Sequence, residues 1–156
     1  MTQNLPFEVL CELRAQGRTL ATAESCTGGL IGKLLTDVPG SSEVYMGGVI
    51  SYTNGVKHRL LGVSEDTLCV YTAVSRQTAH EMARGAREAV QADVGVSVTG
   101  LAGPDGDGTG RPIGLVYIGI DMVGFSFSQE LHLTGDREAI REQAAEAVLR
   151  LILEYA

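Results

Sequence analysis

The chain has 156 residues, of which 44% are hydrophobic and 20% charged, and its formal net charge is −7 at pH 7. This composition is typical of a globular protein, and we expect residues 1–156 to form a single domain. The acidic balance disfavours nucleic acid as a partner, because binding to DNA or RNA depends on cationic side chains that release counterions. A small anionic ligand stays compatible, because one arginine cluster or helix N-terminus is enough to hold a phosphate.

Cysteine usage and the start of the chain limit cofactors and location. Cys11, Cys26 and Cys69 are an odd number at wide spacing, which argues against a disulfide framework. No Cys-x-x-Cys pair or histidine cluster indicates a metal, and we expect neither a metal nor an organic cofactor. The first residues lack a basic and apolar leader, and no apolar run is long enough to cross a bilayer. We therefore expect a cytoplasmic protein without a membrane partner.

The first third of the chain alternates helical and extended patterns. Apolar residues at helical spacing predict a helix over residues 5–16, with Gly17 at its end. A β-rich run over 19–24 follows, and then a second helix over 30–36. Residues 42–53 are expected to be extended, and the glycine pair in the middle of that segment is typical of a bulge or of a close backbone approach.

The central part of the chain contains three candidate helix caps and a buried strand. Asn54 is expected to cap the turn that follows it, and Ser64 to cap another. Ser75 is predicted to begin the most regular helix, which runs to about residue 91 with small apolar residues along one side. Residues 93–101 then resemble a buried strand.

The last third begins with a glycine-rich loop over residues 102–110. Two strands over 113–121 and 125–133 are predicted to form a hairpin that turns at Val123-Gly124, and a helix follows Gly135-Asp136 to the end of the chain. Strands that alternate with helices predict a three-layer α/β/α sandwich. The hairpin makes its sheet of about five strands mixed, although mostly parallel.

Ser25 lies at a predicted strand-to-helix junction, in the segment Ala-Glu-Ser-Cys-Thr-Gly-Gly. Its hydroxyl would project above the edge of the sheet, and the N–H groups of Thr27, Gly28 and Gly29 would point toward an anion or a developing oxyanion. A serine in this place is also commonly a helix N-cap, with the glycines only allowing tight packing. Because Ser-x-x-Gly-Gly differs from the Gly-x-Ser-x-Gly elbow of α/β-hydrolases, the local pattern leaves both interpretations open.

A serine nucleophile needs a base that accepts its proton. The three histidines, His58, His80 and His132, show no triad pattern. Lys57 is a candidate base, because a desolvated lysine loses its proton near neutral pH, and Tyr52 is a candidate proton relay or orienting hydroxyl. A solvated surface lysine is the usual alternative.

Two further features are candidates for binding a phosphate. The glycine-rich segment 99–114 follows a strand, as phosphate loops often do, but fits no standard phosphate-loop motif, and a flexible surface connection is the alternative. Asp105 and Asp107 in this loop are a weak metal pattern, because a third ligand is missing. Arg137 and Arg141 lie one helical turn apart and share a face that suits a phosphate, although surface ion pairs are equally compatible.

Taken in order, these segments resemble the CinA C-terminal domain family. The matching pieces are Ala23-Glu24-Ser25-Cys26-Thr27-Gly28-Gly29, Tyr52-Thr53-Asn54-x-x-Lys57, Ala73-Val74-Ser75, Thr99-Gly100-Leu101-Ala102-Gly103-Pro104, and Gly135-Asp136-Arg137 with Arg141. Each piece alone is modest, whereas the ordered set covers nearly the whole chain and is specific. Many family members carry a further N-terminal domain, and this chain resembles a stand-alone member.

The resemblance implies a mixed-sheet α/β/α fold, a homo-oligomer, and hydrolysis of the carboxamide of nicotinamide mononucleotide to the acid and ammonia. It implies Ser25 as the nucleophile, with Tyr52 and Lys57 as its catalytic neighbours. A pyridine nucleotide is then the expected small-molecule partner. The residues expected to bind it are Thr27, Gly28, Gly29, Asn54, Thr99, Gly100, Ala102, Gly103, Arg137 and Arg141.

Three positions depart from the family pattern. Thr72 stands where the family usually has glycine, and Asp107 replaces the second glycine of Gly-Pro-x-Gly-Gly. The loop ends Arg111-Pro112-Ile113-Gly114 instead of Lys-Pro-Val-Gly, which keeps a cation. We expect Asp107 to disturb a backbone conformation that favours glycine, and hence the fit of the substrate to this loop.

The resulting hypothesis is acyl transfer to Ser25, with Lys57 accepting the proton and Tyr52 assisting. Two other classes of function stay open at this stage. One is a metal-dependent nucleotide phosphohydrolase that uses the same loop. The other is a nucleotide-binding or interaction protein without amidase activity, in which Ser25 only caps a helix.

Overall fold

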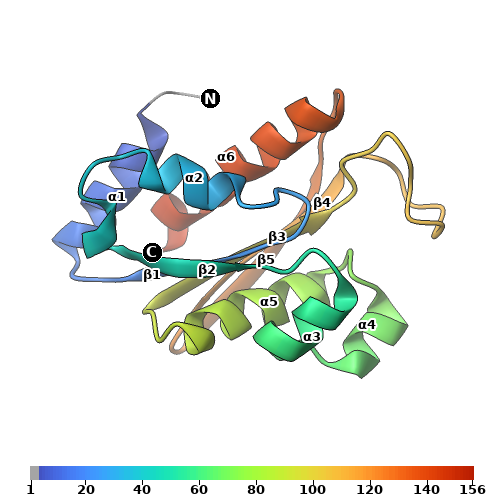
Figure 1. Cartoon of the computed structure of the whole chain (residues 1–156), viewed down its shortest axis with the longest axis horizontal. Coiled ribbons are helices and arrows are strands. Elements are labelled where there is room, and N and C mark those ends of the chain that lie inside the picture. The colour runs from blue at the N-terminus through green and yellow to red at the C-terminus, as the bar shows by residue number, and fades with distance from the viewer. Residues whose placement is uncertain (1–3) are drawn as a thin grey trace.

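The computed structural model describes residues 4–156. The protein has a five-stranded sheet with helices on both faces (Figure 1). The strand order is β2-β1-β3-β4-β5. The strands are β1 (Leu20–Glu24), β2 (Tyr45–Ile50), β3 (Val94–Gly100), β4 (Leu115–Met122) and β5 (Phe125–His132). β1 pairs in parallel with β2 and β3, whereas β4 is antiparallel to β3 and β5. Four strands therefore share one direction, which confirms the predicted mixed, mostly parallel sheet.

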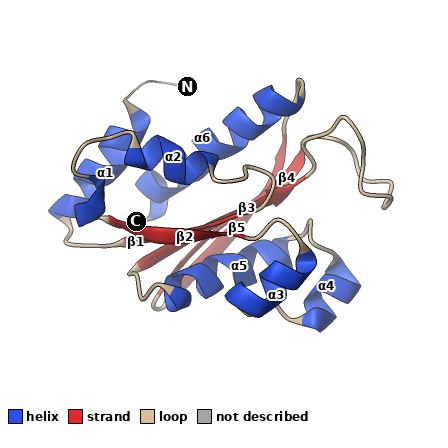
Figure 2. Ribbon diagram, viewed as in Figure 1, coloured by secondary structure: helices blue, strands red, loops and turns tan. Residues whose placement is uncertain are grey.

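The helices form the outer two layers of the predicted α/β/α sandwich (Figure 2). One face of the sheet carries α1 (Leu5–Ala15), α2 (Leu30–Thr36) and α6 (Arg137–Tyr155), and the other carries α3 (Asn54–Leu61), α4 (Glu65–Tyr71) and α5 (Arg76–Ala89). Side chains of β1 alternate between these layers, as strand geometry requires. Leu20 joins the core under α1 and α6, whereas Ala21 and Ala23 pack with Leu61 and Met82 on the opposite face.

The glycine pair in β2 lies beside a bulge and at a close approach of two strands, the two features expected from the sequence. The register between β1 and β2 shifts so that Tyr45 faces Leu20 and Gly47 faces Ala21, which leaves one extra residue in β2. A Cβ atom at Gly48 would lie 2.2 Å from the Thr22 hydroxyl oxygen, so the two strands approach too closely for a side chain.

Most predicted boundaries agree with the structure, and two local predictions are wrong. Thr53, not Asn54, caps α3, because its hydroxyl accepts a hydrogen bond from the Val56 N–H. The segment over 42–53 is not extended throughout, since a 3₁₀ turn at Ser41–Glu43 precedes β2. The predicted caps at Ser64 and Ser75 and the hairpin turn between β4 and β5 are confirmed.

Glycines allow α5 to lie directly on the sheet and α3 to lie directly on α5. A Cβ atom at Gly95 in β3 would be 2.1 Å from the carbonyl oxygen of Ala83 in α5. A Cβ atom at Gly85 in α5 would be 2.0 Å from the carbonyl oxygen of Leu61 in α3. The close packing fixes the distance of α3, and hence of Lys57, from the sheet.

The carboxyl ends of the three parallel neighbours β1, β2 and β3 meet at one edge of the sheet. Ser25 follows β1, Ser51 follows β2, and Leu101 follows β3. In open α/β sheets this edge is the usual place for a ligand. Within residues 4–156, no helix has both the length and the hydropathy that crossing a bilayer requires.

Candidate active site

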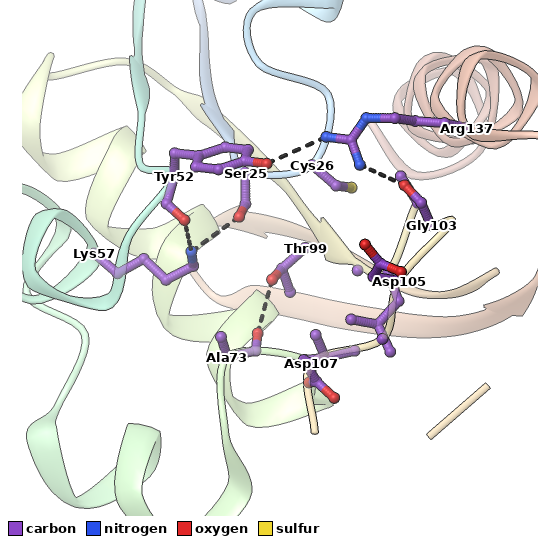
Figure 3. Close-up of a pocket in the computed structure, with 15 residues that line it drawn as sticks. Ser25, Cys26, Tyr52, Lys57, Ala73, Thr99, Gly103, Asp105, Asp107 and Arg137 are labelled. Carbon is purple, nitrogen blue, oxygen red and sulfur yellow. Dashed lines mark hydrogen bonds between the residues drawn. The ribbon is translucent and has the colours of Figure 1, made fainter. Parts of the chain in front are cut away.

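An open pocket of about 250 Å³ lies at this edge of the sheet (Figure 3). This volume is slightly below that of typical small-molecule sites, which start at about 300 Å³. Its wall is formed by residues at the ends of β1, β2 and β3 and by the first turns of α3 and α6. The segment before α5 and the loop after β3 complete it. The side chains and backbone that line it belong to Ser25, Cys26, Tyr52, Lys57, Ala73, Val74, residues 99–103, residues 105–107 and Arg137.

Lys57 reaches from α3 to Ser25 across the floor of the pocket (Figure 3). Its Nζ lies 2.9 Å from the Ser25 Oγ, 2.7 Å from the carbonyl oxygen of Ser51 and 3.3 Å from the carbonyl oxygen of Tyr52. The two carbonyls can only accept hydrogen bonds, whereas the serine hydroxyl can also donate. When the amine is neutral, its two N–H groups can stay on the carbonyls and its lone pair can accept the proton of Ser25.

Burial favours this neutral form of Lys57. The side chain is 1% exposed, and its desolvation lowers the pKa of the amine from 10.5 to about 8. A pKa near the working pH is what a general base needs, because the proton must be accepted and later returned. The solvated surface lysine that was the alternative interpretation is therefore excluded.

Glu24, not Ser25, satisfies the first turn of α2. Its buried carboxylate accepts hydrogen bonds from the Thr27 hydroxyl at 2.8 Å and from the N–H groups of Ile31 and Gly32 at 2.9 and 3.0 Å. Gly29 occupies the N-cap position and supplies no side chain. The interpretation of Ser25 as a plain helix cap is thus wrong, and its hydroxyl is free to face Lys57.

Glu24 is a site residue that was not predicted from the sequence. The available signal was a carboxylate at the end of a predicted strand, five positions before the N-cap of the next helix, whose dipole favours negative charge. That signal gives a cap but not its distance from Ser25, which depends on how the strand ends.

Tyr52 contacts Lys57 through its carbonyl, whereas its hydroxyl belongs to a different group of contacts. Arg137 Nη2 donates to the Tyr52 hydroxyl at 3.2 Å, and Nη1 donates to the carbonyl oxygen of Gly103 at 2.6 Å. Figure 3 shows this guanidinium between the tyrosine ring and the loop after β3. Among the contacts of residues 4–156, the hydroxyl therefore has Arg137, not Lys57 or Ser25, as its hydrogen-bond partner.

Several of the predicted binding residues lie outside the pocket lining. Thr27 is buried against Glu24, and the N–H of Gly28 already donates to the Ser25 carbonyl at 3.1 Å. Asn54 lies on a separate surface groove with Gly55 and His58. Gly29 and Arg141 are also outside the lining. The predicted binding residues that do line the pocket are Thr99, Gly100, Ala102, Gly103 and Arg137.

The loop between β3 and β4 is tied to the segment before α5. Arg111 donates to the Thr72 hydroxyl at 3.1 Å, to the carbonyl of Tyr71 at 3.3 Å and to the carbonyl of Val74. The Thr99 hydroxyl donates to the carbonyl of Ala73 at 2.7 Å. Because residues 73–74 line the pocket, these bonds hold its wall, a role for Arg111 that the sequence did not indicate.

Backbone strain lies at Thr72 and not at Asp107. Thr72 has a φ of +69°, a region that a β-branched residue rarely adopts and that glycine adopts readily. Asp107 is not among the non-glycine residues of the described chain with positive φ, so the backbone cost expected at Asp107 is not incurred.

Cys26 and Asp107, which also line the pocket, have shifted pKa values. Burial raises the pKa of the Cys26 thiol to about 11, which keeps it protonated beside Ser25. A hydrogen bond from the Thr109 hydroxyl lowers the pKa of the Asp107 carboxyl. Within residues 4–156, no group of three or more His, Cys, Asp or Glu side chains is arranged to hold a metal ion.

Known proteins resemble this chain over nearly its whole length. The model of the CinA C-terminal domain matches residues 2–156. Nicotinamide-nucleotide amidohydrolase PncC of Enterobacter agglomerans is 49% identical over 142 residues, which are 90% of this chain and 87% of that protein. A putative competence-damage inducible protein of Halothermothrix orenii is 45% identical over 97% of this chain, and the chain spans only 37% of that relative.

Solved structures agree with these sequence matches. A competence/damage inducible protein from Agrobacterium tumefaciens has a TM-score of 0.94 and 38% identity, covering 97% of this chain and 93% of that one. The competence damage-inducible protein A of Klebsiella pneumoniae has a TM-score of 0.96 and 33% identity, with 99% and 96% coverage. The chain therefore belongs to the CinA C-terminal domain family.

Proposed function

We propose that this chain hydrolyses the carboxamide of nicotinamide mononucleotide to nicotinate mononucleotide and ammonia. The observation that carries the proposal is the 2.9 Å contact between the Lys57 amine and the Ser25 hydroxyl in a pocket at the edge of the sheet. The name of the Enterobacter relative, which matches over 90% of this chain, supports the choice of substrate.

The reaction begins with neutral Lys57, which accepts the proton of Ser25 as Oγ attacks the carboxamide carbon. The resulting ammonium returns the proton to the leaving nitrogen, so that ammonia departs and an ester to Ser25 remains. Lys57 then takes a proton from a water molecule, which attacks the ester, and returns that proton to the Ser25 Oγ as the acid leaves. One amine serves as base and acid in both halves, as in other covalent hydrolases.

The developing oxyanion needs main-chain donors on the pocket side of Ser25. The N–H groups of Gly28, Ile31 and Gly32 already donate to Ser25 or Glu24. The other predicted donors, Thr27 and Gly29, do not line the pocket. We assign the role to the N–H groups of Ala102 and Gly103, which line the pocket and donate to no group of residues 4–156.

Arg137 is the cation that we assign to the phosphate of the substrate. It lines the pocket and lies against the rim residue Tyr52, and two of its five N–H donors are engaged with Tyr52 and Gly103. The loop from Thr99 to Gly103 forms the adjacent wall. In this proposal Tyr52 shapes the binding wall with its ring and holds Lys57 with its carbonyl.

Purified protein incubated with nicotinamide mononucleotide tests the proposal. We expect equal amounts of ammonia and nicotinate mononucleotide, at an unchanged rate in EDTA, because the nucleophile and the base both come from the chain. Release of phosphate or loss of turnover in EDTA would favour a metal-dependent phosphohydrolase instead. Thermal stabilisation by the nucleotide without any turnover would favour a non-enzymatic binding protein.

The homo-oligomer that the family implies and the cytoplasmic location expected from the sequence are proposals of the same kind. Sedimentation velocity over a range of concentrations tests the first of these. A mass that equals one chain at every concentration would contradict it.

A further inference from the structure

Two charged side chains outside the pocket hold the turn that carries Ser25. Glu24 bonds this turn through the hydroxyl of Thr27. Arg141, from α6, bonds the turn through two carbonyl groups, with Nε 3.0 Å from the oxygen of Cys26 and Nη2 2.8 Å from that of Thr27. Neither side chain lines the pocket.

We propose that Glu24 and Arg141 are positioning residues that keep the Ser25 hydroxyl within reach of Lys57, and that Arg141 is not a ligand of the substrate phosphate. The reaction to which this applies is the proposed amide hydrolysis. The two side chains approach the same turn with opposite charges, and each bonds groups of the complementary kind. The carboxylate takes donors, whereas the guanidinium takes carbonyl oxygens.

Arg141 bonds the backbone of the turn and is not among the residues that line the pocket. Its guanidinium lies against the turn so closely that a Cβ atom at Gly28 would be 3.6 Å from its Nη2. The carbonyls that it binds belong to the two residues after Ser25. Rotation of residues 26 and 27 would move the Ser25 side chain. The two hydrogen bonds from Arg141 therefore fix the orientation of Ser25 as well as its position.

Glu24 connects the nucleophile and the base. It is 2% exposed, and its carboxylate holds the start of α2. Its main-chain carbonyl accepts a hydrogen bond from the Ser51 N–H at 2.7 Å. The carbonyl of Ser51 in turn lies 2.7 Å from the Lys57 Nζ. A shift of Glu24 would therefore change the Ser25–Lys57 distance from both sides.

The expected consequence is a loss of kcat with little change in KM. A misplacement of about 1 Å at a reacting group can cost about 10²-fold in rate. Substrate affinity depends on the pocket wall, to which Glu24 and Arg141 do not contribute. A phosphate ligand would behave in the opposite way, because its loss weakens binding of the ground state and transition state alike.

The test compares Arg141→Lys and Glu24→Gln with Arg137→Lys, using nicotinamide mononucleotide. We expect kcat to fall about 10- to 100-fold in the first two variants with KM nearly constant. Arg137→Lys is expected to raise KM. Arg150→Lys is the matched control, because Arg150 is an exposed arginine of the same helix that pairs with Glu146, and both constants should stay at wild-type values. A raised KM with unchanged kcat in Arg141→Lys would overturn the inference.

Crystal structures of the two variants separate this inference from the proposed function. If the wild type releases no ammonia, the amidase proposal fails, but the positioning role is still measured by the Ser25 Oγ to Lys57 Nζ distance. We expect that distance to exceed the wild-type hydrogen bond in both variants. An unchanged distance in both would refute the positioning role, whatever the activity.

Discussion

At the scale of single residues, the site depends on a lysine that the fold has removed from water. The Lys57 amine is buried among three hydrogen-bond acceptors, and of these only the Ser25 hydroxyl can also donate a proton to the amine. This is an unusual environment for a lysine, which is seldom buried without a partner of opposite charge. Burial disfavours the charged amine and so lowers its pKa toward neutrality, which is what a general base requires.

The pH dependence of the reaction follows from this pKa. In the proposed reaction Lys57 acts as base only when neutral, so kcat/KM should rise with pH and level off above an apparent pKa of about 8. Lys57→Met should lower kcat by about 10²- to 10⁴-fold and remove the pH dependence from the remaining rate. Initial rates of ammonia release between about pH 6 and pH 10 test this. A wild-type rate that is flat across the range would contradict it.

Cys26 is adjacent to Ser25 but is predicted to be inert. Burial raises the pKa of its thiol to about 11, and the thiolate is the reactive form. A thiol reagent at about pH 8 should therefore label exposed Cys69 and leave ammonia release unchanged. Cys26→Ala should keep kcat within about threefold of the wild type, because the thiol takes no part in the proton transfers. Rapid inactivation that is absent in Cys26→Ala would show that the thiol is reactive.

The sequence allowed Ser25 and Lys57 to be predicted because each belongs to a recognisable segment. It did not reveal the hydrogen-bond partners of the Tyr52 hydroxyl or of Arg141. Arg137 is 85 positions from Tyr52, and Arg141 is 115 positions from Cys26. Such contacts depend on how α6 crosses the end of the sheet, and no local pattern encodes that.

At the scale of secondary structure, periodicity and turn residues predicted nearly every helix and strand. The errors arose where neighbouring residues compete for one role. Thr53 and Asn54 are both good caps, and only the first has extended backbone in the structure. Likewise, Ser25 looked like a cap because the carboxylate of Glu24 could not be placed at the same helix from sequence alone.

The contact between α3 and α5 is a second test at this scale. Gly85→Ala would place a Cβ 2.0 Å from the Leu61 carbonyl oxygen, and α3 would have to move. We expect a loss of unfolding free energy of about 1–3 kcal/mol, measured by urea denaturation, and a lower kcat because α3 carries Lys57. Arg84→Ala, at the exposed neighbouring position, should cost less than about 1 kcal/mol. Equal stability of the two variants would contradict the close packing.

The loop between β3 and β4 is held to the rest of the pocket by Arg111. Arg111→Gln removes the charged donor that binds the 71–74 segment, so the loop should lose its fixed position over the pocket. Because loop residues form the binding wall, KM should rise about three- to tenfold while kcat changes less. Steady-state kinetics measure both constants. A fall in kcat at constant KM would instead place Arg111 with the catalytic groups.

At the scale of the whole molecule, the parallel strands bring the site together. β1, β2 and β3 are neighbours in one sheet, and their carboxyl ends deliver Ser25, the carbonyls around Lys57 and the glycine-rich loop to one edge. The alternation of strands and helices was enough to predict the layers and the mixed sheet. The strand order β2-β1-β3-β4-β5 was not predictable from the sequence, because it depends on pairings between distant segments.

The most direct test of Ser25 as the nucleophile is ammonia release from nicotinamide mononucleotide by the wild type, by Ser25→Ala and by Ser41→Ala. Ser41 is the matched control, because it is a largely buried serine outside the pocket. We predict wild-type rates for Ser41→Ala and a fall of at least about 10³-fold in kcat for Ser25→Ala, with both variants folded by circular dichroism. Full activity of Ser25→Ala would contradict the assignment of the nucleophile.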